Sequence, residues 1–430
     1  MERKVVISGV GCMTSLGNDV GSTWNALMEG VSGINKIDRI NVEQYQCQFG
    51  GEIKNFNARK AGLTGANLML KYNQFEIFTI IKAITDYGWM DDLKDDTINC
   101  PIYLGNQSIN LDEELFDTLI AISGEKADNL DFSRIGDNLK KFPPLNGVKL
   151  LPTLPTHFIS KKYDLHGSAN VSYAGESSSL EALLRASRDI EMGYYEKAIV
   201  ASTFSPFASH EFLWLSDSNL AKKTAISDDS KQLVFPFDRR HDGIIFGEGA
   251  GVILIESEES ARKNGRTILA NICGGSTNVF PGNSFYTLTK EGFVKNMEAT
   301  IRECSLRNTD MDIIYCSAPS YPEWDNAEIE AIDEIWRDDS VQVTSSKANI
   351  GFLGCAAGII DCILAVKSLN ENTFAKTMNF EQLDPSLNIN YSKYFNFKND
   401  VIQKCLINSA GSGGNYSSII LEKGSVKNDR

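Results

Sequence analysis

The chain has 430 residues, of which 42% are hydrophobic, and a formal net charge of −14. A chain of this size can bury one large core or two ordinary ones, so we expect a globular protein. The acidic balance excludes a binding surface for nucleic acid or for an anionic membrane, because either surface needs clustered basic side chains. No apolar run is long enough to cross a membrane or to serve as a signal peptide, so we expect a cytoplasmic protein.

The nine cysteines and four histidines are scattered along the chain, and no two cysteines form a CxxC pair. An odd number of cysteines in mostly apolar surroundings is typical of reduced core thiols. The pattern does not favour a zinc or iron–sulfur site. We therefore expect neither a metal nor another cofactor.

Short β-branched runs alternate along the chain with stretches of helical periodicity. The first run, Val5–Gly11, ends in glycines and is followed by a predicted helix over 22–28. Alternating strands and helices indicate an α/β protein whose sheets are covered on both faces. Further buried strands are predicted at residues 198–201, 251–255, 313–316 and 418–421.

Two predicted helices follow segments rich in small residues. The first covers 177–190, with leucines spaced along one face, and the second covers 358–369. The stretch 351–358 before the second helix is rich in glycine and alanine, which permits close approach of backbones.

Four segments occur in order along the chain: Val6–Gly11 with Gly17 and Trp24, Phe235–Gly251, Ser345–Gly358 and Asn408–Gly414. Together they resemble the β-ketoacyl-acyl-carrier-protein synthases over almost the whole chain, from Val5 to about Lys423. The resemblance implies an α/β thiolase fold, in which duplicated βαβαβαββ halves form a five-layer α-β-α-β-α sandwich and the protein is dimeric. We place the N-terminal half at 1–260 and the C-terminal half at 261–430.

By this resemblance, condensing enzymes carry a cysteine at a helix N-terminus, where the helix dipole lowers the thiol pKa, and two histidines that stabilise an enolate. This chain has Glu176 at the cysteine position, Ser317 at the first histidine position and Phe352 at the second. Only the family's lysine is retained, as Lys347. The chain therefore lacks the acyl attachment point and both groups that drive decarboxylation.

The resemblance also identifies a glycine-rich gate near the carboxyl end, where active synthases have aromatic residues. Here these positions are Ala410 and Ser412. In a ketosynthase-fold dimer the inactive subunit shapes a tunnel that starts at its partner's cysteine. Ser108, Leu111 and Leu115 would line this tunnel, although an amphipathic helix packed on the core explains each of them equally well.

The missing catalytic residues predict a chain-length-factor subunit of a type II polyketide synthase, without condensing activity of its own. Its expected partners are an active ketosynthase and an acyl carrier protein whose phosphopantetheine carries the malonyl group or the polyketide. An aromatic polyketide is favoured over an aryl polyene as the product. Two alternatives stay open: a malonyl-carrier-protein decarboxylase that uses Glu176, and an acyl-binding homodimer without enzymatic activity. In the structural alternative for Glu176, its carboxylate only accepts hydrogen bonds from the amides of its helix.

Overall fold

The structure is a computed structural model that describes residues 3–90, 93, 100–106, 113–123, 132–142, 145–339, 341–395 and 401–424. Within these residues, strands from both halves of the chain join in one hydrogen-bonded sheet. The strands of the first half are β1 (Val5–Thr14), β4 (Ile102–Gly105), β5 (Ala169–Ser172), β6 (Lys197–Phe204) and β7 (Gly249–Ser257). Those of the second half are β8 (Ala270–Val279), β9 (Ile313–Tyr315), β10 (Gln342–Thr344), β11 (Lys404–Gly411) and β12 (Asn415–Lys423).

The two halves have the same strand order and the same strand directions. The first half runs β5-β4-β6-β7-β1 and the second runs β10-β9-β11-β12-β8. In each half the first three strands of this order are parallel, and the last two pair antiparallel. The halves meet where Val5–Ile7 of β1 pairs with Ala270–Ile272 of β8. The predicted duplication of an α/β unit is confirmed.

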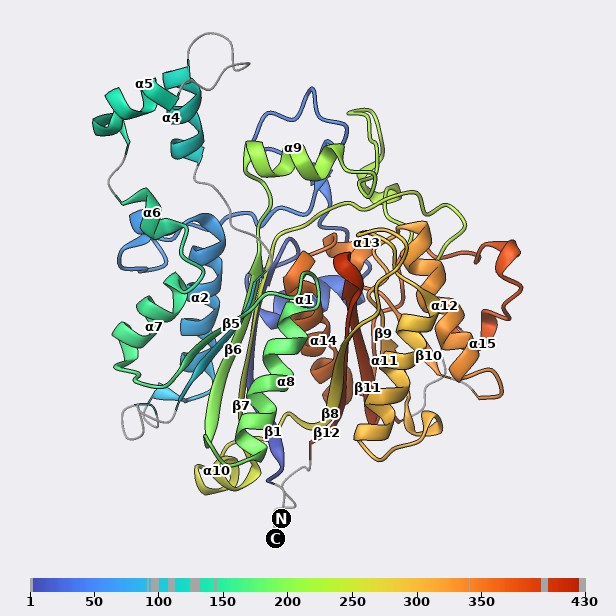
Figure 1. The fold of residues 1–430 in the computed structure, drawn as a ribbon. Helices are drawn as coiled ribbons and strands as arrows, with labels where there is room; N and C mark the ends of the chain where they lie inside the picture. Colours follow the sequence, from blue (N-terminus) through green and yellow to red (C-terminus); the bar gives the residue numbers. More distant parts are fainter. Residues whose placement is uncertain are drawn as a thin grey trace.

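Helices form three layers that alternate with the two halves of the sheet (Figure 1). The central layer consists of α8 (Ser178–Glu191) and α14 (Ala357–Glu371), which contact each other and strands of both halves. Helix α14 is buried on nearly all sides, as expected for a helix between the two halves of the sheet. One outer layer contains α2 (Lys71–Asp86) and α7 (Leu154–Tyr163), and the other contains α11 (Lys290–Glu303) and α12 (Pro322–Ile335).

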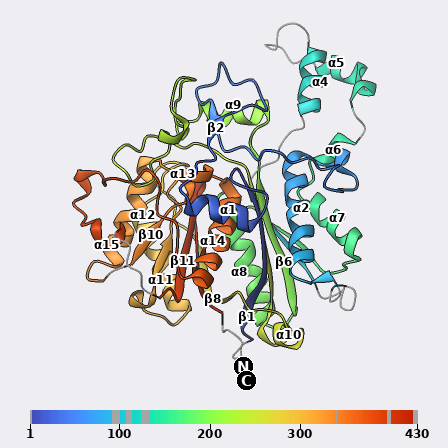
Figure 2. The same ribbon diagram turned by 180° about the vertical axis from the view of Figure 1, so that it is seen from behind.

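The shorter elements lie around this five-layer body. Helices α4 and α5 project from it, and α4 also contacts α9 (Figures 1 and 2). In the described part of the chain, no helix is both long and apolar enough to cross a bilayer. The shorter elements are α1 (Val20–Met28), β2 (Asn35–Lys36), β3 (Phe49–Gly50), α4 (Glu113–Ser123), α5 (Phe132–Asp137), α6 (Asn146–Lys149), α9 (Ser209–Asp217), α10 (Glu258–Lys263), α13 (Lys347–Ile350) and α15 (Ser392–Phe395).

The fold brings two strand-to-helix crossovers together at the carboxyl ends of parallel strands, where open α/β sheets usually bind ligands. In the first half, β5 ends at Ser172 and α8 begins at Ser178 after a turn in which Gly175 has a φ of 57°. A positive φ favours glycine at this turn. In the second half, the chain from β10 to α14 passes through α13 and Phe352.

Candidate functional site

Glu176 lies in the turn before α8 and is 5% exposed. Its Oε2 accepts a hydrogen bond from the backbone N–H of Ser412 at 2.8 Å, and its Oε1 accepts one from the Ser412 hydroxyl at 3.3 Å. Ser412 follows β11 in the turn that leads to β12. The carboxylate is therefore held by a turn of the opposite half of the chain.

Neighbouring hydroxyls join the same two segments through the main chain. Ser177 donates a hydrogen bond to the carbonyl oxygen of Ser409 at 2.9 Å and one to that of Asn415 at 3.2 Å. In the opposite direction, the Ser409 hydroxyl donates to the carbonyl oxygen of Glu176 at 2.8 Å. These bonds fix the turn that carries Glu176 relative to the ends of β11 and β12.

Ser317 is buried two residues after the end of β9, and its hydroxyl and backbone N–H are both hydrogen-bonded within the core. Its hydroxyl donates to the carbonyl oxygen of Ala410 at 3.2 Å, and its backbone N–H donates to Oε1 of Glu328 at 3.1 Å. Glu328 also accepts from the Ala318 N–H at 3.0 Å and from the Asn408 side chain at 2.9 Å. Burial raises the pKa of Glu328 to about 7, although these donors favour its charged form. Ser317 and Glu328 thus form a structural network around the end of β11.

Lys347 is fully buried at the start of α13. Its Nζ forms an ion pair with Asp361 and donates a hydrogen bond to the carbonyl oxygen of Cys316 at 2.6 Å. The Ser346 hydroxyl donates to the other carboxylate oxygen of Asp361 at 2.9 Å. Burial raises the pKa of Asp361, and the nearby ammonium group opposes this shift. Lys347 therefore joins α13, α14 and the end of β9.

Phe352 lies between α13 and α14 and is 2% exposed. Its backbone N–H donates to the carbonyl oxygen of Ile245 at 2.8 Å, and its own carbonyl oxygen accepts from the Gly247 N–H at 2.9 Å. Its ring centroid lies 6.5 Å from that of Phe246 and 6.2 Å from that of Trp324. A phenyl ring can neither donate nor accept a proton, so this position supplies no acid or base.

A cavity of about 490 Å³ opens beside Glu176. Three of the predicted positions line it, namely Glu176, Phe352 and Ser412. Aromatic side chains are the commonest kind in the rest of the described lining, and no sequence pattern predicts that they meet, because they come from separate elements. These residues are Tyr173, Phe204, Trp214, Phe246, Phe285, Tyr286 and Trp324.

The other predicted site residues lie outside this cavity or outside the described residues. Ser317 and Ala410 contact each other but are not among the residues that line the cavity. Leu115 lies half-buried in α4, on the projecting part of the molecule (Figure 1). Ser108 and Leu111 fall outside the described residues, so the tunnel assignment stays a prediction.

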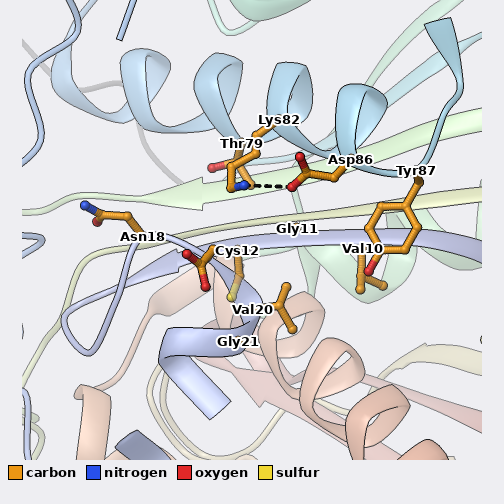
Figure 3. A pocket seen from close by; sticks show the side chains of 11 residues that line it. Val10, Gly11, Cys12, Asn18, Val20, Gly21, Thr79, Lys82, Asp86 and Tyr87 are labelled. Atoms are coloured by element: carbon orange, nitrogen blue, oxygen red, sulfur yellow. Dashed lines mark hydrogen bonds and ion pairs between the residues drawn. The ribbon is translucent and has the colours of Figure 1, made fainter. Parts of the chain in front are cut away.

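A second hollow, of about 330 Å³, lies between β1, α1 and α2 (Figure 3). Lys82 and Asp86 of α2 form an ion pair of 2.7 Å at this hollow, and Asp19 caps α1. None of the predicted site residues lines it. In the described ranges, no group of three or more His, Cys, Asp or Glu side chains is placed to hold a metal ion.

Solved structures of similar shape share the fold at low sequence identity. The ishigamide ketosynthase/chain length factor superposes with a TM-score of 0.85 and 18% identity, covering 98% of this chain and 100% of the other. A type II polyketide synthase ketosynthase bound to the hexaketide, in complex with its acyl-carrier protein, gives a TM-score of 0.83 and 18% identity over 98% and 100%. A beta-ketoacyl synthase from Burkholderia phymatum gives 0.83 and 19% over the same shares.

Curated relatives align along nearly the whole chain. The 3-oxoacyl-acyl-carrier-protein synthase 2 of Staphylococcus aureus strain N315 is 26% identical over 431 residues, 98% of each chain. The enzyme of the same name from Vibrio harveyi is 25% identical over 98% of this chain and 99% of its own. The N-terminal domain of beta-ketoacyl synthase matches residues 2–261, and the C-terminal domain matches residues 269–381. The chain therefore belongs to the beta-ketoacyl synthase family.

Proposed function

We propose that this chain is a non-catalytic subunit of the chain-length-factor type. It pairs in the cytoplasm with an active ketosynthase and shapes the tunnel for the growing poly-β-ketoacyl chain of a type II polyketide synthase. The observation that carries the proposal is the buried carboxylate of Glu176, which is bonded to Ser412. The sequence resemblance assigns this position to the cysteine of the family's condensing enzymes.

The chemistry of the three replaced positions argues against condensation by this chain alone. A carboxylate in place of the thiolate can form only a labile mixed anhydride with an acyl group. Ser317 is bonded to Ala410 and Glu328, and Phe352 is surrounded by aromatic rings. Neither can replace an imidazole as a hydrogen-bond donor to an enolate.

Among the inactive roles, the similar solved structures support that of a chain-length factor. One of them is a ketosynthase/chain length factor, and another holds a ketosynthase together with its acyl-carrier protein. The curated relatives are synthases, so membership of the family does not by itself distinguish an active subunit from an inactive one. The thiol and imidazole groups that are missing at Glu176, Ser317 and Phe352 support the choice of an inactive subunit.

In the proposed complex, Ser108, Leu111 and Leu115 of this subunit line the tunnel. Ala410 and Ser412 lie at the positions where active synthases have the aromatic residues of the gate. Ala410 and Ser412 have smaller side chains than the aromatic residues of active synthases. Only the partner's cysteine carries the chain in this scheme, and an aromatic polyketide is the favoured product over an aryl polyene. The carrier protein presents the malonyl groups to the partner.

Co-expression with an active ketosynthase of a type II polyketide synthase from the same organism tests the proposal. We expect a stable one-to-one heterodimer by size-exclusion chromatography and native mass spectrometry. This chain expressed without that ketosynthase is the control for self-association. A homodimer that does not bind the ketosynthase would instead support the acyl-binding alternative. Release of carbon dioxide from malonyl-carrier protein by this chain alone would support the decarboxylase alternative.

A further inference from the structure

A pocket of about 250 Å³ lies between α2 and α7 in one outer layer of the fold. The two helices lie side by side (Figures 1 and 2). None of the residues that line this pocket also lines the cavity beside Glu176, so the two sites are separate. The described lining residues are Gly62, Leu63, Thr64, Met69, Ile77, Ile81, Phe158, Lys161 and Lys162.

The buried side of the pocket is apolar. Leu63, Met69 and Ile77 are each at most 7% exposed and belong to one hydrophobic cluster. The segment that carries Met69 is tied to α2, because the Gln74 side chain donates to the carbonyl oxygens of Ala66 at 3.0 Å and Met69 at 3.1 Å. The apolar surface is therefore in place before any ligand binds, which lowers the entropic cost of binding.

The open side of the pocket has two exposed lysines, Lys161 and Lys162, in the last turn of α7. Neither forms an ion pair with a described residue, and the Nζ of Lys162 lies 5.7 Å from the centroid of the Tyr163 ring. The next acidic residue along the chain, Asp164, lies 3.3 Å from Nε2 of His166. The described lining contains neither Asp nor Glu. An anion at the mouth of the pocket would thus meet two positive charges and no negative one.

The segments around the pocket have no acidic residues, although the whole chain has a net charge of −14. Residues 53–75 and 138–163 contain lysine and arginine but neither Asp nor Glu. Arg59 and Lys60 are exposed on the turn just before Gly62. Lysines in the last turn of a helix also stabilise its negative end, but that role does not require a basic turn on the opposite side of the pocket. The local charge therefore favours an anionic ligand.

We propose that this pocket binds an amphipathic anion, which has an unbranched apolar chain and one carboxylate or phosphate headgroup. The chain packs against Leu63, Met69 and Ile77, while the headgroup lies at the mouth beside Lys161 and Lys162. A neutral chain gains only the apolar contact, and an ammonium headgroup is repelled. The inference goes beyond the proposed function, because ligand binding at this pocket and pairing with a ketosynthase are separate properties.

Four probes that share an octyl chain test the proposal by calorimetry with the full-length protein. They are octanoate, octyl phosphate, 1-octanol and octyltrimethylammonium. We expect one or both anions to bind at least fivefold more tightly than the alcohol, and the ammonium probe to bind most weakly. The tighter anion identifies the headgroup. Because salt screens exposed charges, this preference should shrink as the salt concentration rises to about 0.5 M. Equal affinities, a preference for the ammonium probe, or no binding of either anion would overturn the proposal.

A lysine variant tests the role of the charge. The double change Lys161→Gln with Lys162→Gln should lower affinity for the tighter anion at least fivefold and change affinity for the alcohol less than twofold. The matched control is Lys231→Gln with Lys263→Gln, which replaces two exposed lysines outside the pocket lining and should change neither affinity. All four side chains are exposed, so we expect both variants to fold.

A second variant tests the position of the apolar chain. Thr64 is exposed and lines the pocket, so Thr64→Trp should fill the opening and leave the core unchanged. It should lower affinity for the anion and for the alcohol alike, at least fivefold. Unchanged anion affinity in this variant or in the lysine variant would place binding outside this pocket. Either result would contradict the proposal, whatever the result of the pairing experiment.

Discussion

The side chain of Glu176 occupies the space directly above the backbone of Gly411. A Cβ atom at residue 411 would lie 2.0 Å from Oε2 and 2.6 Å from Cβ of Glu176. Such distances are far inside van der Waals contact. The identity of residue 411 is therefore coupled to the side chain at 176, across two segments that are 235 positions apart in the sequence.

This contact predicts that Gly411→Ala destabilises the protein. Overpacking of a buried site costs about 2 kcal/mol, which urea denaturation followed by circular dichroism would detect. Combining it with Glu176→Ala should recover part of the loss, because the truncation removes the carboxylate and leaves only the contact with Cβ. Additive effects of the two changes would show that the residues do not interact.

Glu176→Cys should create a thiol that iodoacetamide modifies faster than any of the nine native cysteines. Burial raises the pKa values of eight of these native thiols, for example to about 12 for Cys12 and Cys355. A thiol in the turn before α8 lies near the positive end of the helix dipole, which favours the thiolate. We expect labelling without condensation, because Ser317 and Phe352 supply no imidazole. Formation of a β-ketoacyl product by this variant alone would contradict the roles assigned to those two positions.

The buried ion pair of Lys347 with Asp361 predicts a strong penalty when one partner is removed. Lys347→Met should lower the free energy of unfolding by about 4 kcal/mol, because Asp361 then stays buried without its partner. The double change Lys347→Met with Asp361→Leu should recover much of that loss. The measurement is a double-mutant cycle by denaturant unfolding. A near-neutral single variant would show that Lys347 has no structural role.

Glu76 on α2 predicts a specific pH dependence of stability. Burial raises the pKa of this carboxyl to about 8 from an ordinary value of 4.5. The folded protein thus binds the proton more tightly than the unfolded chain, so the contribution to stability is full below about pH 4.5 and is lost as pH rises through about 8. The loss is on the order of 5 kcal/mol from the size of the shift.

Glu76→Gln should therefore gain stability relative to the native protein as the pH rises from 5 to 8. Urea denaturation at three pH values measures the difference in the free energy of unfolding between the variant and the native protein. Glu181→Gln, on α8, is the matched control. A constant difference across the range would indicate that Glu76 is not protonated in the folded protein.

Much of the fold could be predicted from the sequence. The strands and helices expected from local patterns match β1, β6, β7, β9, β12, α8 and α14 within a few residues. Apolar periodicity is a local property, so each helix or strand can be predicted from its own segment of the sequence. Duplication of the sheet was expected only through the family resemblance, because pairing between distant strands leaves no local pattern.

The sequence identifies candidate site residues, but it does not predict which residues surround them. Glu176, Phe352 and Ser412 meet at one cavity, but the aromatic wall comes from separate elements and has no common sequence motif. Likewise, the hydrogen bonds from the amide and hydroxyl of Ser412 to Glu176 could not be predicted, because the two residues lie 236 positions apart in the sequence. Glu328 was not identified at all, since its role follows only from its contacts with Ser317 and its neighbours.

The most direct test of the account is a condensation assay with malonyl-carrier protein, in which products are analysed by mass spectrometry. We expect no β-ketoacyl product and no carbon dioxide from this chain alone. We expect polyketide only when the active ketosynthase is present, with a chain length that changes when this subunit is exchanged for a homologue. Product formed by the purified chain without a partner would contradict the account.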